Sequence, residues 1–198
     1  MKKIGILGGT FDPVHFGHIS LARKALSQYG LDRVLVMTGG NPPHKRDREI
    51  TDAKIRNEMV MRALENEKNI IAFDYEVRKQ EYSYTAKTLT ELNELYPDWQ
   101  IYFIIGEDSL CDLPTWYEPE TVCQNCILLV FPRSLDSRLD LLIKERTKEF
   151  NADIRKINAP LVNVSSTDIR NRIRTGDDIS GLVPRRVYEY IAEKGLYK

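Results

Sequence analysis

Short apolar runs rich in β-branched residues alternate along this chain with longer stretches of helical periodicity. The short runs cover residues 3–7, 33–38, 70–73, 100–105, 126–131 and 154–157, with a further extended piece at 161–164. The helical stretches cover residues 15–29, 52–65, 85–96, 136–149, 166–175 and 184–194. Strands that alternate with helices predict βαβ units and therefore a parallel sheet. We expect an α/β fold, a doubly wound parallel sheet with a helical C-terminal tail.

Composition narrows the class of protein further. The 29 basic and 29 acidic side chains leave a formal net charge of zero, which argues against a polybasic protein that binds nucleic acid or a membrane surface. The first apolar run is too short for an export signal, and no apolar stretch approaches the roughly 20 residues that span a bilayer. Without a linker-like segment or a repeat, a single domain over residues 1–198 is expected. We predict a cytoplasmic protein. Its sequence leaves the oligomeric state open between a monomer and a homo-oligomer.

The loop that follows the first predicted strand has the ingredients of an anion site. It matches neither the G-x-G-x-x-G nor the P-loop pattern, which disfavours a dinucleotide dehydrogenase and a P-loop kinase. Gly8 and Gly9 let the backbone approach a ligand, and His15 and His18 stand at the start of a helix, whose first N–H groups attract anions. Two other readings remain: the histidines cap or pack the helix, or they bind zinc together with His44.

Three further loops reach the same expected edge of the sheet, where doubly wound folds bind their ligands. The loop after residue 38 carries a basic cluster with His44 and Lys45, which is either a polyphosphate site or a solvated surface. Gly106 and Asp108 follow the fourth strand and form either a nucleotide contact or a plain turn and helix cap.

The fourth loop reads SSTDIR at residues 165–170. Ser165 and Asp168 have the spacing of a capping box, which predicts a helix that begins at Ser166. Arg170 lies close to the first N–H groups of this helix, so hydroxyls, amides and a guanidinium converge where an oxyanion could sit. Capped helices are common, so this signal alone is weak.

Two remaining motifs have both a structural and a functional reading. Trp116 and Tyr117 lie between the fourth and fifth strands and either pack in the core or offer a flat surface to a heteroaromatic ring. Cys123 and Cys126 have the spacing of a redox or zinc pair, but they lead into a strand and no second pair exists, so we interpret them as structural.

The string GGTFDPVHFGH at residues 8–18, together with SSTDIR at 165–170, resembles the paired signature of the H-x-G-H nucleotidyltransferase superfamily. Further matches run in order along nearly the whole chain and resemble the bacterial nicotinate mononucleotide adenylyltransferases. They include Pro43-His44-Lys45, Ser83-Tyr84-Thr85, Asp108-Ser109-Leu110, Trp116 and Pro132-Arg133. The chain departs from the family at Lys87, where relatives usually carry Asp, and at Glu107, where they carry a small residue.

The resemblance implies a Rossmann-like fold and adenylyl transfer from ATP to nicotinate mononucleotide, which gives deamido-NAD and pyrophosphate for NAD biosynthesis. Mg²⁺ would be carried by the ATP phosphates with few or no protein ligands, and Asp12 is the one candidate contact. The catalytic residues implied are His15, His18, Lys45 and Arg170. ATP would be bound by these two histidines and Arg170 together with Gly8, Gly9, Thr10, Gly106, Asp108, Ser165, Ser166 and Ile169. The nicotinate nucleotide would be bound by Asp12, His44, Lys45, Thr85, Trp116 and Tyr117.

Two alternatives are weighed against this function. Within the superfamily, a phosphopantetheine adenylyltransferase is disfavoured by Trp116, by the Ser83-Tyr84-Thr85 helix start and by Thr167-Asp168-Ile169-Arg170. From a different class, the chain could be a nucleotide-sensing module without catalysis. Turnover with ATP separates the enzyme from the sensor.

Overall fold

The computed structural model describes residues 1–40, 50–79, 83–132, 138–159 and 164–198. The strands are β1 (Lys2–Gly9), β2 (Arg33–Thr38), β3 (Ile70–Phe73), β4 (Trp99–Gly106), β5 (Ile127–Phe131) and β6 (Ile154–Lys156). The helices are α1 (Phe16–Tyr29), α2 (Ala53–Ala63), α3 (Thr85–Leu95), α4 (Glu107–Asp112), α5 (Pro119–Asn125), α6 (Arg138–Phe150), α7 (Ser166–Thr175) and α8 (Arg185–Lys194). A 3-10 turn, η2 (Leu113–Thr115), joins α4 to the segment before α5.

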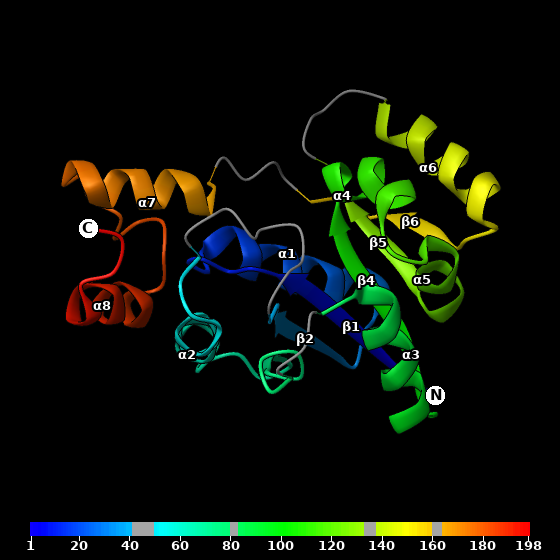
Figure 1. The fold of residues 1–198 in the computed structure, drawn as a ribbon, viewed down its shortest axis with the longest axis horizontal. Coiled ribbons are helices and arrows are strands. Elements are labelled where there is room, and N and C mark those ends of the chain that lie inside the picture. Colours follow the sequence, from blue (N-terminus) through cyan, green and yellow to red (C-terminus); the bar gives the residue numbers. More distant parts are fainter. Residues whose placement is uncertain (41–49, 80–82, 133–137, 160–163) are drawn as a thin grey trace.

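The strands form one parallel sheet in the order β3-β2-β1-β4-β5-β6 (Figure 1). The chain adds strands outward from β1 in one direction and then returns to add β4, β5 and β6 on the other side of β1. The order therefore reverses between β1 and β4, which is the position where this class of sheet binds its ligands. The predicted doubly wound, Rossmann-like fold is confirmed.

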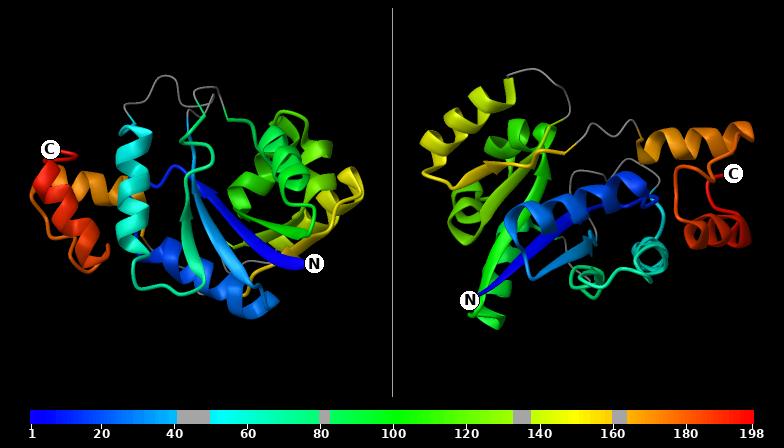
Figure 2. Two further views of the ribbon diagram at one scale, coloured as in Figure 1. Left: turned by 90° about the horizontal axis from the view of Figure 1, so that it is seen from below. Right: turned by 180° about the vertical axis from the view of Figure 1, so that it is seen from behind.

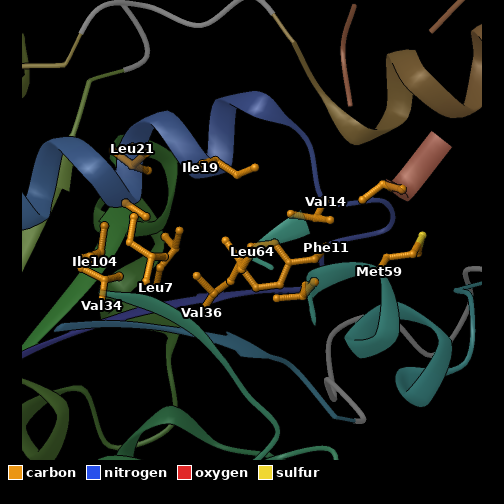
Figure 3. Close-up of a cluster of buried hydrophobic side chains, with 14 of the residues drawn as sticks. Leu7, Phe11, Val14, Ile19, Leu21, Val34, Val36, Met59, Leu64 and Ile104 are labelled. Atoms are coloured by element: carbon orange, nitrogen blue, oxygen red, sulfur yellow. The ribbon is translucent and has the colours of Figure 1, made fainter. Parts of the chain in front are cut away.

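Helices cover both faces of the sheet, because successive strand side chains point to opposite faces. Leu7 and Ile104 pack with residues of α1, α2, α7 and α8 on one face, and Figure 3 shows the central part of this cluster. Ile6 and Phe103 pack with residues of α3, α4, α5 and α6 on the other face. Figures 1 and 2 show α7 and α8 beyond the carboxyl end of β1, as a helical tail next to the loop that leads into α1.

The local signals in the sequence placed most of these elements well. Gly30 ends α1 with φ 56°, a left-handed conformation that glycine adopts readily, and Ser165 caps α7 through a 3.1 Å hydrogen bond from the Asp168 N–H. The extended piece expected at 161–164 lies almost wholly outside the described residues.

Between β4 and β5 the sequence carries no signal for η2 and α5, whereas α4 begins after Gly106, where a helix cap was one of the two interpretations. The elements α4, η2 and α5 have 6, 3 and 7 residues. A segment this short completes fewer than two helical turns, so it shows no readable period. The strand expected from Cys126 begins one residue later at Ile127, and Cys126 instead ends α5.

Candidate active site

A cavity of about 480 Å³ opens at the carboxyl ends of β1 and β4, where the strand order reverses. Nine residues that the sequence singled out line this cavity: Gly8, Gly9, Thr10, His18, Thr85, Gly106, Asp108, Trp116 and Tyr117. Several other lining residues carry no signal in the sequence, among them Met37, Gly39, Glu76, Phe103 and Phe131. Residues from the loops after β1 and β4 and from the start of α3 therefore meet around one space, as the fold class predicted.

His18 lines the cavity, and its ring is oriented by its own loop. The His15 N–H donates to His18 Nδ1 at 3.2 Å, so Nδ1 is an acceptor and the proton of a neutral ring is on Nε2. The His15 ring stacks on the His18 ring with centroids 3.7 Å apart. The Phe11 ring meets the His18 ring edge-on, with centroids 4.9 Å apart. His15 itself is buried, at 6% exposure, and is the N-cap residue of α1. The two histidines thus occupy different positions: His18 at the cavity and His15 behind it.

Helix α7 is attached to the loop between β1 and α1. The Ser166 hydroxyl donates to the Pro13 carbonyl at 2.9 Å, and Arg170 donates through Nη1 to the Asp12 carbonyl at 2.7 Å. Ile169 is fully buried in the core. The two halves of the sequence signature therefore lie side by side, although Ser165, Ser166, Ile169 and Arg170 are not among the residues that line the cavity.

Asp12 is held within the protein. Its carboxylate accepts from the Tyr197 hydroxyl at 2.6 Å through Oδ1 and from the Thr51 N–H at 3.3 Å through Oδ2. The residue is only 6% exposed and does not line the cavity. Burial first, and then the hydrogen bond to Asp12, raise the pKa of Tyr197 far above its usual value, so the phenol stays protonated and donates.

Arg56 is a buried arginine that the sequence analysis did not identify. At 2% exposure, its guanidinium donates to the carbonyls of Thr10 at 2.6 Å, Gly40 at 3.0 Å and Thr51 at 2.7 Å. Burial lowers the pKa of Arg56, and the nearby Asp12 charge opposes that shift. The loops after β1 and β2 and the approach to α2 are thereby joined at one side chain. No local sequence pattern predicts that Arg56 is buried, because the sequence of α2 has the usual periodicity of an amphipathic helix.

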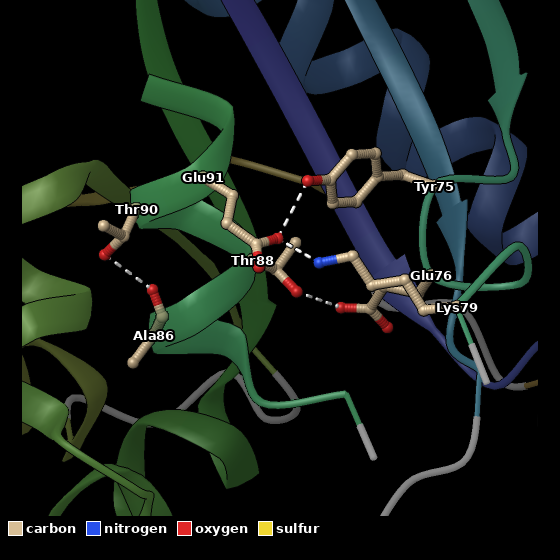
Figure 4. Close-up of polar contacts among 7 residues, drawn as sticks. All are labelled: Tyr75, Glu76, Lys79, Ala86, Thr88, Thr90 and Glu91. Carbon is tan, nitrogen blue, oxygen red and sulfur yellow. Dashed lines mark hydrogen bonds and ion pairs between the residues drawn. The ribbon is translucent and has the colours of Figure 1, made fainter. Parts of the chain in front are cut away.

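The turn after β3 is attached to α3 by polar contacts (Figure 4). The Thr88 hydroxyl donates to the buried Glu76 carboxylate at 2.9 Å, and the Tyr75 hydroxyl donates to Glu91 at 2.8 Å, where Lys79 also forms an ion pair. Burial raises the pKa of Glu76, although hydrogen bonds from Thr88 and the Gly40 backbone favour its charged form. These contacts fix the start of α3 relative to the sheet.

Gly40 packs so closely against this turn that no side chain fits. A Cβ at Gly40 would lie 2.6 Å from the Glu76 carbonyl oxygen, a backbone atom that cannot rotate away. We expect Gly40→Ala to lower the free energy of unfolding by about 1–3 kcal/mol, measured by urea denaturation. Gly181→Ala is the matched control, because no atom lies within 4 Å of its Cβ position, and it should change stability by less than about 0.5 kcal/mol. Equal effects in both variants would contradict the steric argument.

The start of α3 forms an aromatic wall of the cavity. The rings of Tyr84 and Tyr117 are 4.7 Å apart, and the Lys87 ammonium lies 5.5 Å and 5.8 Å from their centroids. Tyr84 is the N-cap residue of α3 and makes no side-chain capping bond, so the first N–H groups of the helix are not capped by that side chain. Trp116 is half-buried and also packs against the core.

The remaining predicted residues are placed as follows. Gly106 ends β4 and is the N-cap residue of α4, and Asp108 in that helix lines the cavity. His44 and Lys45 lie outside the described residues. Within the described parts of the chain, no three His, Cys, Asp or Glu side chains are grouped to hold a metal ion.

Cys123 and Cys126, the pair with the redox or zinc spacing, are both free thiols. Cys123 is buried in α5, and burial raises its pKa to about 11; burial raises the pKa of the Cys126 thiol further still. Because the thiolate is the reactive species, these shifts favour the structural interpretation over a redox pair. Over the ranges that the structure covers, none of the helices has the length and apolar character needed to cross a membrane.

Comparisons with known proteins agree with this geometry. Residues 6–172 match the cytidylyltransferase-like family model. A curated protein of Clostridium novyi, named "Probable nicotinate-nucleotide adenylyltransferase", is 45% identical over 200 residues that cover 100% of both chains. A Clostridium tetani protein of the same name is 41% identical, again over 100% of both chains. The solved structure of Plasmodium falciparum nicotinic acid mononucleotide adenylyltransferase, complexed with NaAD, superposes with a TM-score of 0.82 at 24% identity and covers 100% of this chain and 98% of that one.

Proposed function

Because the chain belongs to the cytidylyltransferase-like family, and within it to the nicotinate-nucleotide adenylyltransferases, we propose that it transfers the adenylyl group of ATP to nicotinate mononucleotide. The products are deamido-NAD and pyrophosphate, and the reaction is a step of NAD biosynthesis. The single observation that carries this proposal is the cavity at the strand-order reversal, which brings His18 from the first signature loop together with Thr85, Trp116 and Tyr117.

The chemistry needs little from the protein besides position and charge. A phosphate monoester has a second pKa near 6, so the attacking oxygen is largely ionised at neutral pH without a general base. This oxygen forms a bond to the α-phosphorus of ATP, and the bond from the α-phosphorus to the bridging oxygen of pyrophosphate breaks. The enzyme must hold two anions in line and stabilise the charge that develops on the transferred group and on the leaving pyrophosphate.

We assign the charge stabilisation to His18, Lys45 and Arg170, with His15 in support of His18. His18 donates from Nε2 to the reacting phosphate, a role supported by the bond that occupies Nδ1 as an acceptor. The buried His15 acts through its backbone N–H and its stacked ring, which hold His18 in that orientation. Lys45 and Arg170 bind the outer phosphates, with the N-terminal N–H groups of α7.

Adenosine and the nicotinate nucleotide then occupy opposite sides of the cavity. Adenosine contacts Gly8, Gly9 and Thr10, Gly106 and Asp108, and the backbone around Ser165, Ser166 and Ile169. The pyridine ring faces Thr85, Trp116 and Tyr117, and we assign Asp12, His44 and Lys45 to the binding of the nicotinate nucleotide.

Mg²⁺ enters with ATP as part of the substrate. When bound, it would neutralise phosphate charge and would keep several of its waters, as Mg²⁺ bound to nucleotides commonly does. Asp12 is a poor direct ligand, because it is buried, does not line the cavity and has its carboxylate held by Tyr197 and the Thr51 N–H. This supports a cation held mainly by phosphates and water.

Pyrophosphate release is the experiment that tests the function. Purified protein is incubated with MgATP and, in separate reactions, nicotinate mononucleotide, nicotinamide mononucleotide or 4′-phosphopantetheine. We expect rapid release with the nicotinate nucleotide and formation of deamido-NAD. Release only with phosphopantetheine would assign the chain to the other adenylyltransferase, and ATP binding without turnover would indicate a sensing module. The predicted cytoplasmic location and the open question of self-association are checked by fractionation and by sedimentation.

Trp116 provides a second test of the acceptor side. We expect Trp116→Ala to raise the KM for nicotinate mononucleotide about tenfold and to leave the KM for ATP within about twofold, since ring stacking of about 1.4 kcal/mol holds only the acceptor. Trp99→Ala is the matched control, because Trp99 stacks on Tyr96 at the start of β4, far from the cavity. A normal acceptor KM combined with a lowered unfolding temperature would favour core packing as the role of Trp116.

A further inference from the structure

The loop between β1 and α1 is attached to residues from very distant parts of the sequence. Asp12 and Tyr197 are 185 positions apart, and Asp12 and Arg170 are 158 positions apart, yet each pair is joined by a hydrogen bond shorter than 2.8 Å. The Phe16 N–H also donates to the Leu182 carbonyl at 3.0 Å. The C-terminal helices therefore do more than cover the sheet, because they hold this loop.

Asp12 is the point at which these contacts converge. Its two carboxylate oxygens accept from Tyr197 and from the Thr51 N–H, and its carbonyl accepts from Arg170. The loop that precedes it is held at the Thr10 carbonyl by Arg56, a buried positive charge that also interacts with Asp12. The position of Asp12 is consequently fixed by groups from α2, α7 and the segment after α8.

The ring of His18 depends on the same loop for its orientation. Phe11, the residue before Asp12, meets the His18 ring edge-on, and His15, three residues after Asp12, stacks on it and donates to Nδ1. A shift of Asp12 would therefore be transmitted to both neighbours of the ring. Because a displacement of about 1 Å at a reacting group can cost as much as 10² in rate, a small shift would suffice to matter.

The Tyr197 hydroxyl is suited to a fixed positioning role. It is a neutral donor at physiological pH, because burial and Asp12 raise its pKa. A hydrogen bond to a carboxylate such as Asp12 is stronger than one between two neutral groups. The sulfur neighbour of the Tyr197 hydroxyl, Met59 Sδ at 3.9 Å, is a weak acceptor that cannot compete for the proton.

We propose that Tyr197 is a positioning residue for adenylyl transfer: through its hydrogen bond to Asp12 it holds the loop that orients His18. This inference rests on the proposed function, because its test by kcat measures adenylyl transfer. It goes beyond that function, because it gives the segment after α8 a role in the rate of the reaction and makes the Asp12 carboxylate a part of the scaffold.

Tyr197→Phe removes only the hydroxyl and is the variant that tests this role. We expect kcat to fall about tenfold, with the KM for ATP within about twofold and folded structure retained by circular dichroism. Tyr29→Phe is the matched control, because it removes a half-buried tyrosine hydroxyl that donates to the Lys156 carbonyl at 2.7 Å, remote from the cavity. This control should lower the unfolding temperature by a similar amount and leave kcat unchanged.

A double-mutant cycle with His18→Ala separates positioning from a general structural effect. If Tyr197 acts through His18, then Tyr197→Phe lowers kcat by less than twofold in the His18→Ala background, because the group that it positions is gone. An equal, additive loss of about tenfold in both backgrounds would overturn the proposal. So would an unchanged kcat in Tyr197→Phe alone, an equal loss in Tyr29→Phe, or a Tyr197→Phe protein that no longer folds.

A measurement without substrate keeps this test independent of the proposed reaction. We expect the imidazole resonances of His18 in NMR spectra of the free protein to move in Tyr197→Phe and to stay in place in Tyr29→Phe. Unmoved His18 resonances would overturn the positioning role even in an active enzyme. Wild-type protein that releases no pyrophosphate would instead overturn the proposed function, and the resonance shift would still report on the loop.

Discussion

We expect the replacement of His18 by alanine to lower kcat for adenylyl transfer by a factor on the order of 10² or more, with a smaller change in the KM for ATP. His18 lines the cavity, and its Nδ1 accepts from the His15 N–H, which leaves Nε2 as the donor toward phosphate. A preorganised donor acts mainly on the charge that develops in the transition state, so its loss is seen in kcat more than in ground-state binding. The measurement is steady-state pyrophosphate release at saturating acceptor with ATP varied.

Two comparisons sharpen the His18 test. Phe16→Ala changes an exposed aromatic residue in the same first turn of α1, and it should leave kcat within about twofold. A zinc role for the histidines makes a different prediction, namely stoichiometric zinc in purified protein and inactivation by a chelator that Mg²⁺ does not reverse. Unchanged turnover in His18→Ala would show that another group supplies the stabilisation.

The second large effect is selectivity for the acid acceptor. We predict a kcat/KM for nicotinate mononucleotide that exceeds that for nicotinamide mononucleotide by at least about 10². A carboxylate accepts on both oxygens, and the first N–H groups of α3 at Thr85, which Tyr84 does not cap, are donors with the positive end of the helix dipole behind them. The amide would turn an NH₂ donor toward these donors or leave it unpaired, and sites built on such bonds discriminate strongly.

The Lys87 ammonium adds to this preference. It lies on the first turn of α3, near the Tyr84 and Tyr117 rings that line the cavity, where it makes the local potential more positive. Parallel assays with both acceptors at saturating ATP measure the ratio. A ratio near one, or a preference for the amide, would contradict the carboxylate site at α3 and leave the adenylyltransferase function standing.

Local sequence patterns indicated many of the residues that line the cavity. The glycine-rich loop after β1, the capped start of α7 and the aromatic pair after η2 were each recognised from neighbouring residues. The first and the third of these segments contribute to the nine predicted residues that line the cavity, and the start of α7 does not. His15 shows the limit of that reasoning. Both histidines were expected to donate to the ATP phosphates, with capping or packing as the alternative. The structure buries His15 behind His18 as the N-cap residue of α1, whose extended backbone directs its side chain differently.

The sequence by itself determined the order and type of most strands and helices, the parallel sheet and the edge at which the cavity opens. These follow from hydrophobic period, helix stop and start residues and the geometry of βαβ units, all of which act over a few neighbouring residues. Only the tertiary structure decided that Arg56 is buried and holds three loops, that Asp12 is bound by Tyr197, and that Glu76 stands on the cavity wall. Such contacts join residues that are distant along the chain, and whether a polar side chain finds its partners inside the protein depends on the packing of elements and on no local pattern.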